Sequence, residues 1–278
     1  MKINAYAKIN LTLNVVEKRS DGYHNVDMLM QSVSLCDIID IEKIFSGIEL
    51  SGTGSLTYDK TNLAYKAARL FFDVSGVRGG VRIHINKNIP MCAGMAGGSA
   101  DAAAVLKGLN TLYGNPISKS VLLKIASRLG ADVPFCILEK TARATGIGDK
   151  LTVVAPMPRK CVLVVKPPVS VSTPEAYGSL DFENMAHPDT EKAVDAIAKS
   201  DMKLLYSLMA NSFEYSIFKK YPKIASIKAK LADLGADASL MSGSGSAVFG
   251  IFEDEAKAKE AYEIFKKEYS EVFICHTV

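Results

Sequence analysis

The sequence has no long hydrophobic run, and this absence excludes a membrane-spanning helix. None of its apolar stretches approaches the roughly 18 residues that a span requires. The segment MKINAYAKINLTLNVV at the N-terminus carries a lysine but no continuous apolar core, so we expect no signal peptide. We therefore expect a cytoplasmic protein with no membrane partner.

Cysteine and net charge are also low. The five cysteines are odd in number, scattered along the chain and without a C-x-x-C pair, which indicates reduced thiols rather than a zinc site or a disulfide framework. The net charge is only +3, and no dense patch of lysine and arginine is present. Such a chain favours an anionic small molecule slightly and gives no support for a nucleic-acid partner. Internal repeats and low-complexity tracts are lacking as well.

What is present is a mixture of strand and helix patterns over 278 residues. Residues 2–15 alternate in polarity, which predicts a strand with one buried face and one polar face. Further patterns predict strands at 26–42, 79–90, 161–168 and 271–278, and helices at 61–76, 99–113, 118–130, 190–200, 224–235 and 254–269. Their order lacks the regular alternation of a Rossmann sheet, so we expect an α+β fold. Two prolines near residue 156 suggest two domains, 1–155 and 156–278.

A glycine-rich segment, NIPMCAGMAGGSADAAAVLKGLN at residues 88–110, is expected to form the end of a strand, a loop and a helix. The start of a helix attracts anions, and glycines allow a phosphate to approach the backbone closely. Ser99 is the expected N-cap. The spacing G-x-x-G-G matches neither a Walker A loop nor the Rossmann fingerprint. Taken alone, the segment is either a phosphate cradle or a tight turn that permits close helix packing.

Three other segments are ordinary when taken singly. AYAKINLTL places Lys8 and Asn10 on the polar face of the first strand. LGADVPF places Asp132 in a loop, with Val133 before a proline and hence expected to be extended. LMSGSGSAVFGIF holds a glycine and serine turn between two apolar runs.

In this order, however, the four segments resemble the GHMP kinase superfamily. Residues 90–100 are similar to its ATP phosphate loop, and SGSGSAVFG is similar to its third motif. Within the superfamily, A-x-A-K-I-N-L-x-L followed by R-x-D-G-Y-H, together with GADVPF, resembles the kinases of 4-(cytidine 5′-diphospho)-2-C-methyl-D-erythritol. The resemblance covers nearly the whole chain.

The resemblance implies a fold and a reaction. The fold is an N-terminal ATP-binding domain with a left-handed β-α-β unit, followed by a ferredoxin-like C-terminal domain. The reaction is ATP-dependent phosphorylation of the C2 hydroxyl of the cytidyl substrate in the non-mevalonate isoprenoid pathway, with Mg²⁺ as cofactor and a small molecule as partner. The sequence assigns no oligomeric state.

The resemblance also implies roles for particular residues. Lys8 and Asp132 match the catalytic pair, and Asn10 is expected to contact the substrate. Tyr23 and Tyr177 are expected to enclose the cytosine ring, with His24 at its polar edge. The ATP-binding set is Asn62, Pro90, Met91, Cys92, Ala93, Gly94, Met95, Ala96, Gly97, Gly98, Ser99 and Ala100.

The loop departs from the common family pattern, because Met95, Ala96 and Ala100 replace a leucine, a glycine and a second serine. Ser99 is thus the one serine in the loop, and it is the candidate for contact with Mg²⁺ through MgATP. No residue is assigned as a metal ligand. Asp101 either orients Mg²⁺ or complements the helix dipole, and we favour the dipole.

Two alternatives remain. The first is another small-molecule kinase of the superfamily, acting on a mevalonate-type substrate or on homoserine. The R-S-D-G-Y-H segment argues against it, because those substrates have no nucleobase for Tyr23 and His24 to bind. The second is a nucleic-acid-binding protein, since the fold of the N-terminal domain also occurs in ribosomal and translation proteins. The low net charge and the phosphate loop disfavour it.

Overall fold

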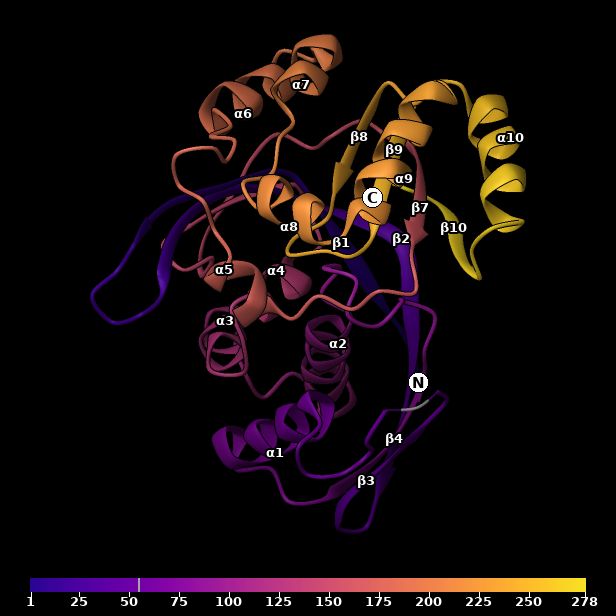
Figure 1. Ribbon diagram of the computed structural model, residues 1–278. Helices are drawn as coiled ribbons and strands as arrows, with labels where there is room; N and C mark the ends of the chain where they lie inside the picture. Colours follow the sequence, from indigo (N-terminus) through magenta and orange to yellow (C-terminus); the bar gives the residue numbers. More distant parts are fainter. Residues whose placement is uncertain (55) are drawn as a thin grey trace. The chain divides into compact units, whose positions relative to one another are not determined.

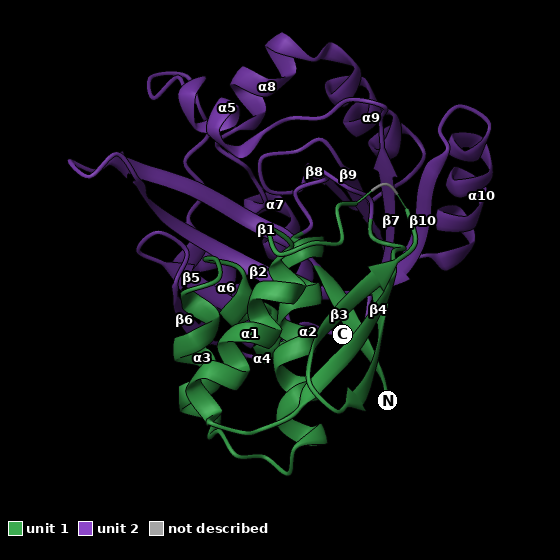
Figure 2. Ribbon diagram, turned by 90° about the horizontal axis from the view of Figure 1, so that it is seen from below, with its two compact units in different colours: residues 1–7, 36–89, 96–139 green, residues 8–35, 90–95, 140–278 purple. Residues whose placement is uncertain are grey.

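The computed structural model describes residues 1–54 and 56–278, which form two compact units (Figure 2). Unit 1 contains residues 1–7, 36–89 and 96–139, and unit 2 contains residues 8–35, 90–95 and 140–278. Two long strands, β1 (Lys2–Lys18) and β2 (His24–Ile44), pair with each other and contribute residues to both units. The division at residue 155 stays a prediction, because these units are built from discontinuous segments and do not test a boundary between continuous domains.

Unit 1 consists of helices packed on strands. Strands β3 and β4 are parallel, and β4 pairs antiparallel with residues 38–44 of β2. Helix α1 connects β3 to β4 and packs against α2, which also contacts α3 and α4 (Figure 1). The elements are β3 (Gly47–Gly52), α1 (Leu63–Ser75), β4 (Gly80–Asn86), α2 (Gly97–Leu112), α3 (Lys119–Ser127) and α4 (Val133–Leu138).

The long alanine-rich helix α2 is buried along most of its length. Small side chains allow this close packing. At Gly108, for example, an added Cβ would overlap the Cδ1 atom of Ile3 and would lie 2.5 Å from Cδ1 of Ile41. The predicted helix at 99–113 is therefore confirmed, and Gly108 allows it to approach Ile3 and Ile41 closely.

Unit 2 contains a four-stranded antiparallel sheet in the order β10-β7-β9-β8. Helix α9 packs on β8 and β9, and α10 packs on β7 and β10. This order of strands, with one helix before β8 and one after β9, is the ferredoxin-like arrangement that the resemblance implied. The elements of this part are β7 (Cys161–Lys166), α9 (Pro222–Asp233), β8 (Ala238–Met241), β9 (Val248–Phe252), α10 (Glu255–Lys266) and β10 (Glu271–His276).

The remaining elements of unit 2 include a short antiparallel pair, in which β5 joins residues 28–30 of β2 on one side and β6 on the other. Four helices precede α9, and α6 packs against α7. The elements are β5 (Ala142–Thr145), β6 (Lys150–Val153), α5 (Thr173–Gly178), α6 (Thr190–Ala198), α7 (Met202–Leu208) and α8 (Glu214–Lys220). In the part of the chain that the structure describes, every helix is too short or too polar to cross a membrane.

Two local expectations were wrong. The polar face of β1 is not solvated in its middle, because Lys8, Asn10 and Thr12 are as buried as the apolar residues between them. Val133 is helical rather than extended, since it begins α4. Pro134 is tolerated there because the N–H groups of a helix's first turn have no partner within the helix.

Candidate active site

Lys8 is a buried cation that binds the glycine-rich loop. The residue is only 4% exposed. Its Nζ donates to Asn10 Oδ1 and to Gly94 O, both at 2.6 Å, and its backbone N–H donates to Met95 O at 3.1 Å. A buried ammonium requires such acceptors, because removing a charge from water is costly. Residues 8–18 of β1 and the loop segment 90–95, which lie in the same unit, are therefore joined through Lys8.

The turn at residues 242–245 packs on the same point of the loop. Ser242 Oγ donates to Gly94 O at 2.9 Å. An added Cβ at Gly94, whose φ is +70°, would overlap Ser242 O, so only glycine fits at that position. Asn211 Nδ2 in turn donates to Met241 O and Gly243 O, each at 2.8 Å. Three segments far apart in the sequence thus meet at Gly94, and Asn211, which no motif singled out, supports them.

The loop ends at a helix start without a side-chain cap. The N-cap of α2 is Ala96, with φ +59° and no side-chain cap hydrogen bond. The expectation that Ser99 is the N-cap was wrong, because the helix begins two residues earlier and Ser99 is its third residue. The positive end of α2 is therefore available to an anion. This arrangement favours the phosphate cradle among the two interpretations of the glycine-rich segment.

The two adjacent glycines at the start of α2 differ in their surroundings. An added Cβ at Gly97 would lie 3.2 Å from Ile89 Cγ2 and 3.5 Å from Lys87 Nζ, so this glycine serves close packing. An added Cβ at Gly98 would meet only Leu63 Cδ1, at 3.8 Å, and Gly98 is exposed. Packing within the described protein explains Gly97 but leaves Gly98 free for an approaching ligand.

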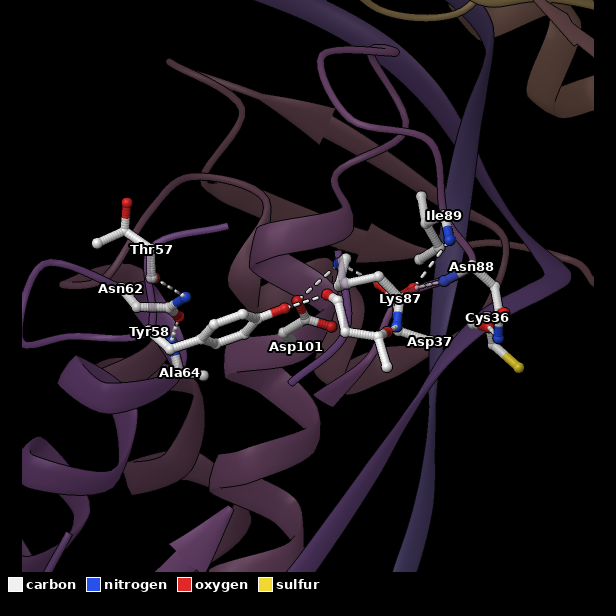
Figure 3. A network of polar contacts seen from close by, with 11 residues as sticks. Cys36, Asp37, Thr57, Tyr58, Asn62, Ala64, Lys87, Asn88, Ile89 and Asp101 are labelled. Atoms are coloured by element: carbon white, nitrogen blue, oxygen red, sulfur yellow. Dashed lines mark hydrogen bonds and ion pairs between the residues drawn. The ribbon is translucent and has the colours of Figure 1, made fainter. Parts of the chain in front are cut away.

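Asn62 forms the N-cap of α1. Its Oδ1 accepts from the Ala64 N–H at 2.9 Å, and its Nδ2 donates to Thr57 O at 3.0 Å (Figure 3). The side-chain amide therefore fixes the start of the helix. Figure 3 shows the ring of Tyr58 extending from beside Asn62 toward Asp101. The assignment of Asn62 to the adenosine site stays a prediction.

Asp132 lies in unit 1, at the N-cap position of the short helix α4, while Lys8 lies in unit 2. Its carboxylate makes no side-chain cap hydrogen bond, and the residue is half-buried. A negative charge at this position is stabilised by the positive end of the helix. The catalytic role of the pair stays a prediction.

An aromatic cluster in unit 2 joins two of the predicted substrate residues. The ring of His24 stacks on that of Tyr177, with 4.7 Å between centroids and 25° between planes. Phe213 contacts Tyr177 edge-on at 4.9 Å, and Phe182 lies parallel to His24 at 6.3 Å. Tyr23 is 61% exposed on the neighbouring turn. The cluster has the aromatic surfaces that a nucleobase requires, and Phe182 is a member that the motifs did not indicate.

The position of His24 also influences its charge. Burial lowers the pKa of the imidazole, and the nearby Lys18 ammonium lowers it further. His24 is therefore neutral at neutral pH, with one ring nitrogen that donates and one that accepts. A neutral imidazole of this kind is able to distinguish a donor from an acceptor on a base edge.

Among residues 1–54 and 56–278, no group of three or more His, Cys, Asp or Glu side chains is placed to hold a metal ion. We expected Asp101 to be a free carboxylate that complements the helix dipole, and this expectation was wrong. Asp101 is the fifth residue of α2 and is paired with Lys87, at 2.8 Å between Lys87 Nζ and Asp101 Oδ2.

Comparison with known proteins agrees with this geometry. The model of the GHMP kinases N terminal domain matches residues 62–140, and that of the GHMP kinases C terminal domain matches residues 193–271. A 4-diphosphocytidyl-2-C-methyl-D-erythritol kinase of Clostridium botulinum (strain Alaska E43 / Type E3) is 44% identical over 280 residues, covering 100% of both chains. One of Clostridium novyi (strain NT) is 43% identical over the same length. The chain belongs to the 4-diphosphocytidyl-2-C-methyl-D-erythritol kinase family of the GHMP kinases.

Solved structures support the same family. A crystal structure of 4-(cytidine 5′-diphospho)-2C-methyl-D-erythritol kinase matches with a TM-score of 0.87 and 36% identity, covering 100% of this chain and 99% of the other. A mevalonate kinase of L. major matches with a TM-score of 0.77 at 15% identity, covering 100% and 95% of the two chains. The second likeness concerns the fold alone. The GHMP kinase fold expected from the motifs is thus confirmed, and the chain is a kinase.

Proposed function

We propose that this kinase transfers the terminal phosphoryl group of ATP to the C2 hydroxyl of 4-(cytidine 5′-diphospho)-2-C-methyl-D-erythritol, which gives the 2-phosphate and ADP. This reaction belongs to non-mevalonate isoprenoid precursor synthesis. The cytoplasm is the proposed compartment, in agreement with five cysteines that are scattered along the sequence without a disulfide framework.

The stack of His24 on Tyr177 is the observation that carries the choice of substrate. Mevalonate and homoserine have no aromatic ring, so a kinase for either gains nothing from this cluster. A cytosine ring gains stacking energy on Tyr177 and meets a neutral imidazole that can bond its edge. The aromatic cluster therefore favours the cytidyl substrate over the other substrates of the superfamily.

On the acceptor side we assign Asp132 to the C2 hydroxyl. As the oxygen–phosphorus bond to the acceptor forms and the bond to ADP breaks, the hydroxyl proton passes to the carboxylate. Lys8 stabilises negative charge near the reacting phosphoryl group. Asn10, which accepts a hydrogen bond from Lys8 Nζ, contacts the cytidyl substrate that receives this group. Lys8 is held for this task by Gly94 O.

On the nucleotide side the start of α2 receives the phosphates. Its uncapped N–H groups and its dipole favour the negative charge, and Gly98 leaves room for the approach. Mg²⁺ neutralises phosphate charge in kinases and is commonly held by few protein groups together with the phosphates. The hydroxyl of Ser99, at the third position of α2, is the group of this chain that we propose for it.

The test is an ADP-release assay with purified protein, ATP and Mg²⁺. We expect turnover with the cytidyl substrate and none above background with mevalonate or homoserine. Phosphorus NMR of the product is expected to show a new phosphomonoester together with the unchanged diphosphate. Turnover with mevalonate or homoserine and none with the cytidyl substrate would overturn the assignment.

A nucleic-acid-binding role is tested with the same preparation. We expect no retention of RNA at moderate salt, because the net charge is only +3. Tight RNA binding without ATP consumption would favour that role instead.

A further inference from the structure

A buried carboxylate on β2, Asp37, holds the chain just before the glycine-rich loop. Asp37 is fully buried. Its Oδ1 accepts from the backbone N–H groups of Asn88 and Ile89 at 2.6 and 2.8 Å, and its Oδ2 pairs with Lys87 Nζ (Figure 3). Three donors on one carboxylate offset the cost of burying its charge. Residues 87–89 are therefore bound as a unit to β2.

Lys87 extends this connection to the helix that follows the loop. The same Nζ donates to Asp101 Oδ2 at 2.8 Å. Burial lowers the pKa of Lys87, but the two carboxylates outweigh it and raise the pKa overall, so the ammonium stays charged. One cation thus bridges β2 and α2, with two carboxyl groups around it, and burial raises the pKa of Asp101 to about 7.

The two sides of the loop are also in direct contact. Gly97, the first residue of α2, lies so close to Ile89 that an added Cβ would be 3.2 Å from its Cγ2. All of these groups belong to unit 1. The strand end held by Asp37 and the helix start that faces the phosphates are consequently fixed against each other.

The cluster is not arranged for stability alone. Asp101 Oδ1 is buried and has no hydrogen-bond partner among the described residues. An unsatisfied buried acceptor opposes folding, and apolar residues would join a strand to a helix without that penalty. Charged groups instead fix one relative position, because their bonds are directional.

We propose that Asp37 is a positioning residue for the nucleotide: through Lys87, Asn88 and Ile89 it sets the place of the first turn of α2 relative to the ATP phosphates. This inference rests on the proposed function. Asp37 itself makes no contact with the substrate or the nucleotide in this assignment, so its effect is expected in nucleotide binding rather than in binding of the cytidyl substrate.

The experiment compares Asp37→Asn with the parent enzyme by calorimetric titration of a non-hydrolysable ATP analogue with Mg²⁺ and, separately, of the cytidyl substrate. An asparagine that keeps its oxygen as the acceptor for Asn88 and Ile89 turns its NH2 donor toward the Lys87 ammonium. We expect the Kd for the nucleotide to rise about tenfold or more, since small misplacements weaken a preorganised site steeply. We expect the Kd for the cytidyl substrate to change by less than about twofold, because none of the groups that Asp37 binds belongs to the residues assigned to that substrate.

Glu139→Gln is the matched control. Glu139 pairs with Lys107 of α2, so this variant removes a carboxylate–lysine pair from the same helix at a site away from the loop. It is expected to leave both Kd values unchanged. Equal losses for both ligands in Asp37→Asn, or an unchanged nucleotide Kd, would overturn the proposal.

If Asp37→Asn does not fold, Asp101→Asn decides the question, because it leaves the three bonds of Asp37 in place. The same selective loss for the nucleotide, smaller in size, supports the proposal, and an unchanged nucleotide Kd overturns it. Failure of the proposed function is a separate result, in which the parent enzyme itself binds no nucleotide or no cytidyl substrate.

Discussion

Replacing Gly98 with alanine separates a ligand-binding role of the loop from a packing role. Gly98 is exposed on the first turn of α2, and its backbone is not in the left-handed region that favours glycine. An added Cβ would have one neighbour within 4 Å, Leu63 Cδ1 at 3.8 Å, which is an ordinary contact distance. The protein without ligand therefore has space for the methyl group.

The expected effect on stability is small and favourable. Alanine in place of glycine in a helix stabilises by about 0.5–1 kcal/mol, mainly by restricting the unfolded chain. In a chain of this size such a gain raises Tm by roughly 1–4 °C. The gain is at the lower end here, because the first turn of a helix is the part most prone to fray.

The expected effect on ATP is unfavourable. A phosphate oxygen bonded to a backbone N–H sits about 2.9 Å from the nitrogen, and a Cβ on the same residue intrudes on that approach. Loss of one charge-assisted hydrogen bond costs about 1.5–3 kcal/mol, which corresponds to a Kd about 10- to 150-fold higher. The Kd for the cytidyl substrate is expected to stay the same.

The assay is calorimetric titration of both ligands together with thermal unfolding, with Gly94→Ala as a comparison. An alanine at Gly94 would overlap Ser242 O in a left-handed backbone, so we expect a lower Tm for that variant. Parental ATP affinity in a stably folded Gly98→Ala variant would refute the phosphate cradle at this residue. A large drop in its Tm would show that the packing argument is wrong.

The other predictions concern the acceptor side. Lys8→Met and Asp132→Asn should each lower kcat by about 10²–10⁴, with both Kd values within a few-fold, as measured by steady-state kinetics and titration. If the imidazole of His24 reads the base, His24→Ala should reduce the preference for cytidyl over uridyl substrate by about tenfold or more, whereas a preference that persists indicates backbone reading. Tyr177→Ala should weaken binding of the cytidyl and uridyl substrates alike, by roughly 1–3 kcal/mol. An unchanged KM for the cytidyl substrate would remove Tyr177 from the site. Because burial lowers the pKa of His24, the folded state binds fewer protons than the unfolded state below about pH 6.5. The free energy of unfolding should therefore fall as the pH is lowered through this range, and His24→Ala should reduce that fall in urea unfolding at pH 7.5 and 5.5.

Much of the candidate site was predictable because its residues lie in short contiguous motifs. The strand with Lys8, the glycine-rich loop and the turn at residues 242–245 are each local in sequence, and their glycines and polar residues are unusual enough to recognise. The helix after the loop was also predictable from its apolar spacing, although its start was placed two residues too late. The cap was assigned to a hydroxyl, whereas Ala96 in a left-handed backbone takes that position.

Other parts of the site had no local signal. Asn211 is a single asparagine whose bonds to the glycine turn exist only because β1 and the turn meet it in space. Phe182 became a candidate through its distance to His24. Asp37 and Lys87 are 50 residues apart, and nothing in either segment indicates the other.

The sequence by itself determined the family, the positions of the longer strands and helices, and the residue types available for phosphate and nucleobase binding, because these depend on periodicity and on motifs that are contiguous in the chain. Only the tertiary structure decided which of the polar residues are buried and what they bind. Lys8 reads as a solvated residue by its alternation, and it is buried on Gly94 O. Asp101 reads as a charge for the helix dipole, and it is paired with Lys87. Burial and pairing of a charge depend on neighbours brought together by folding, and periodicity along one segment carries no information about them.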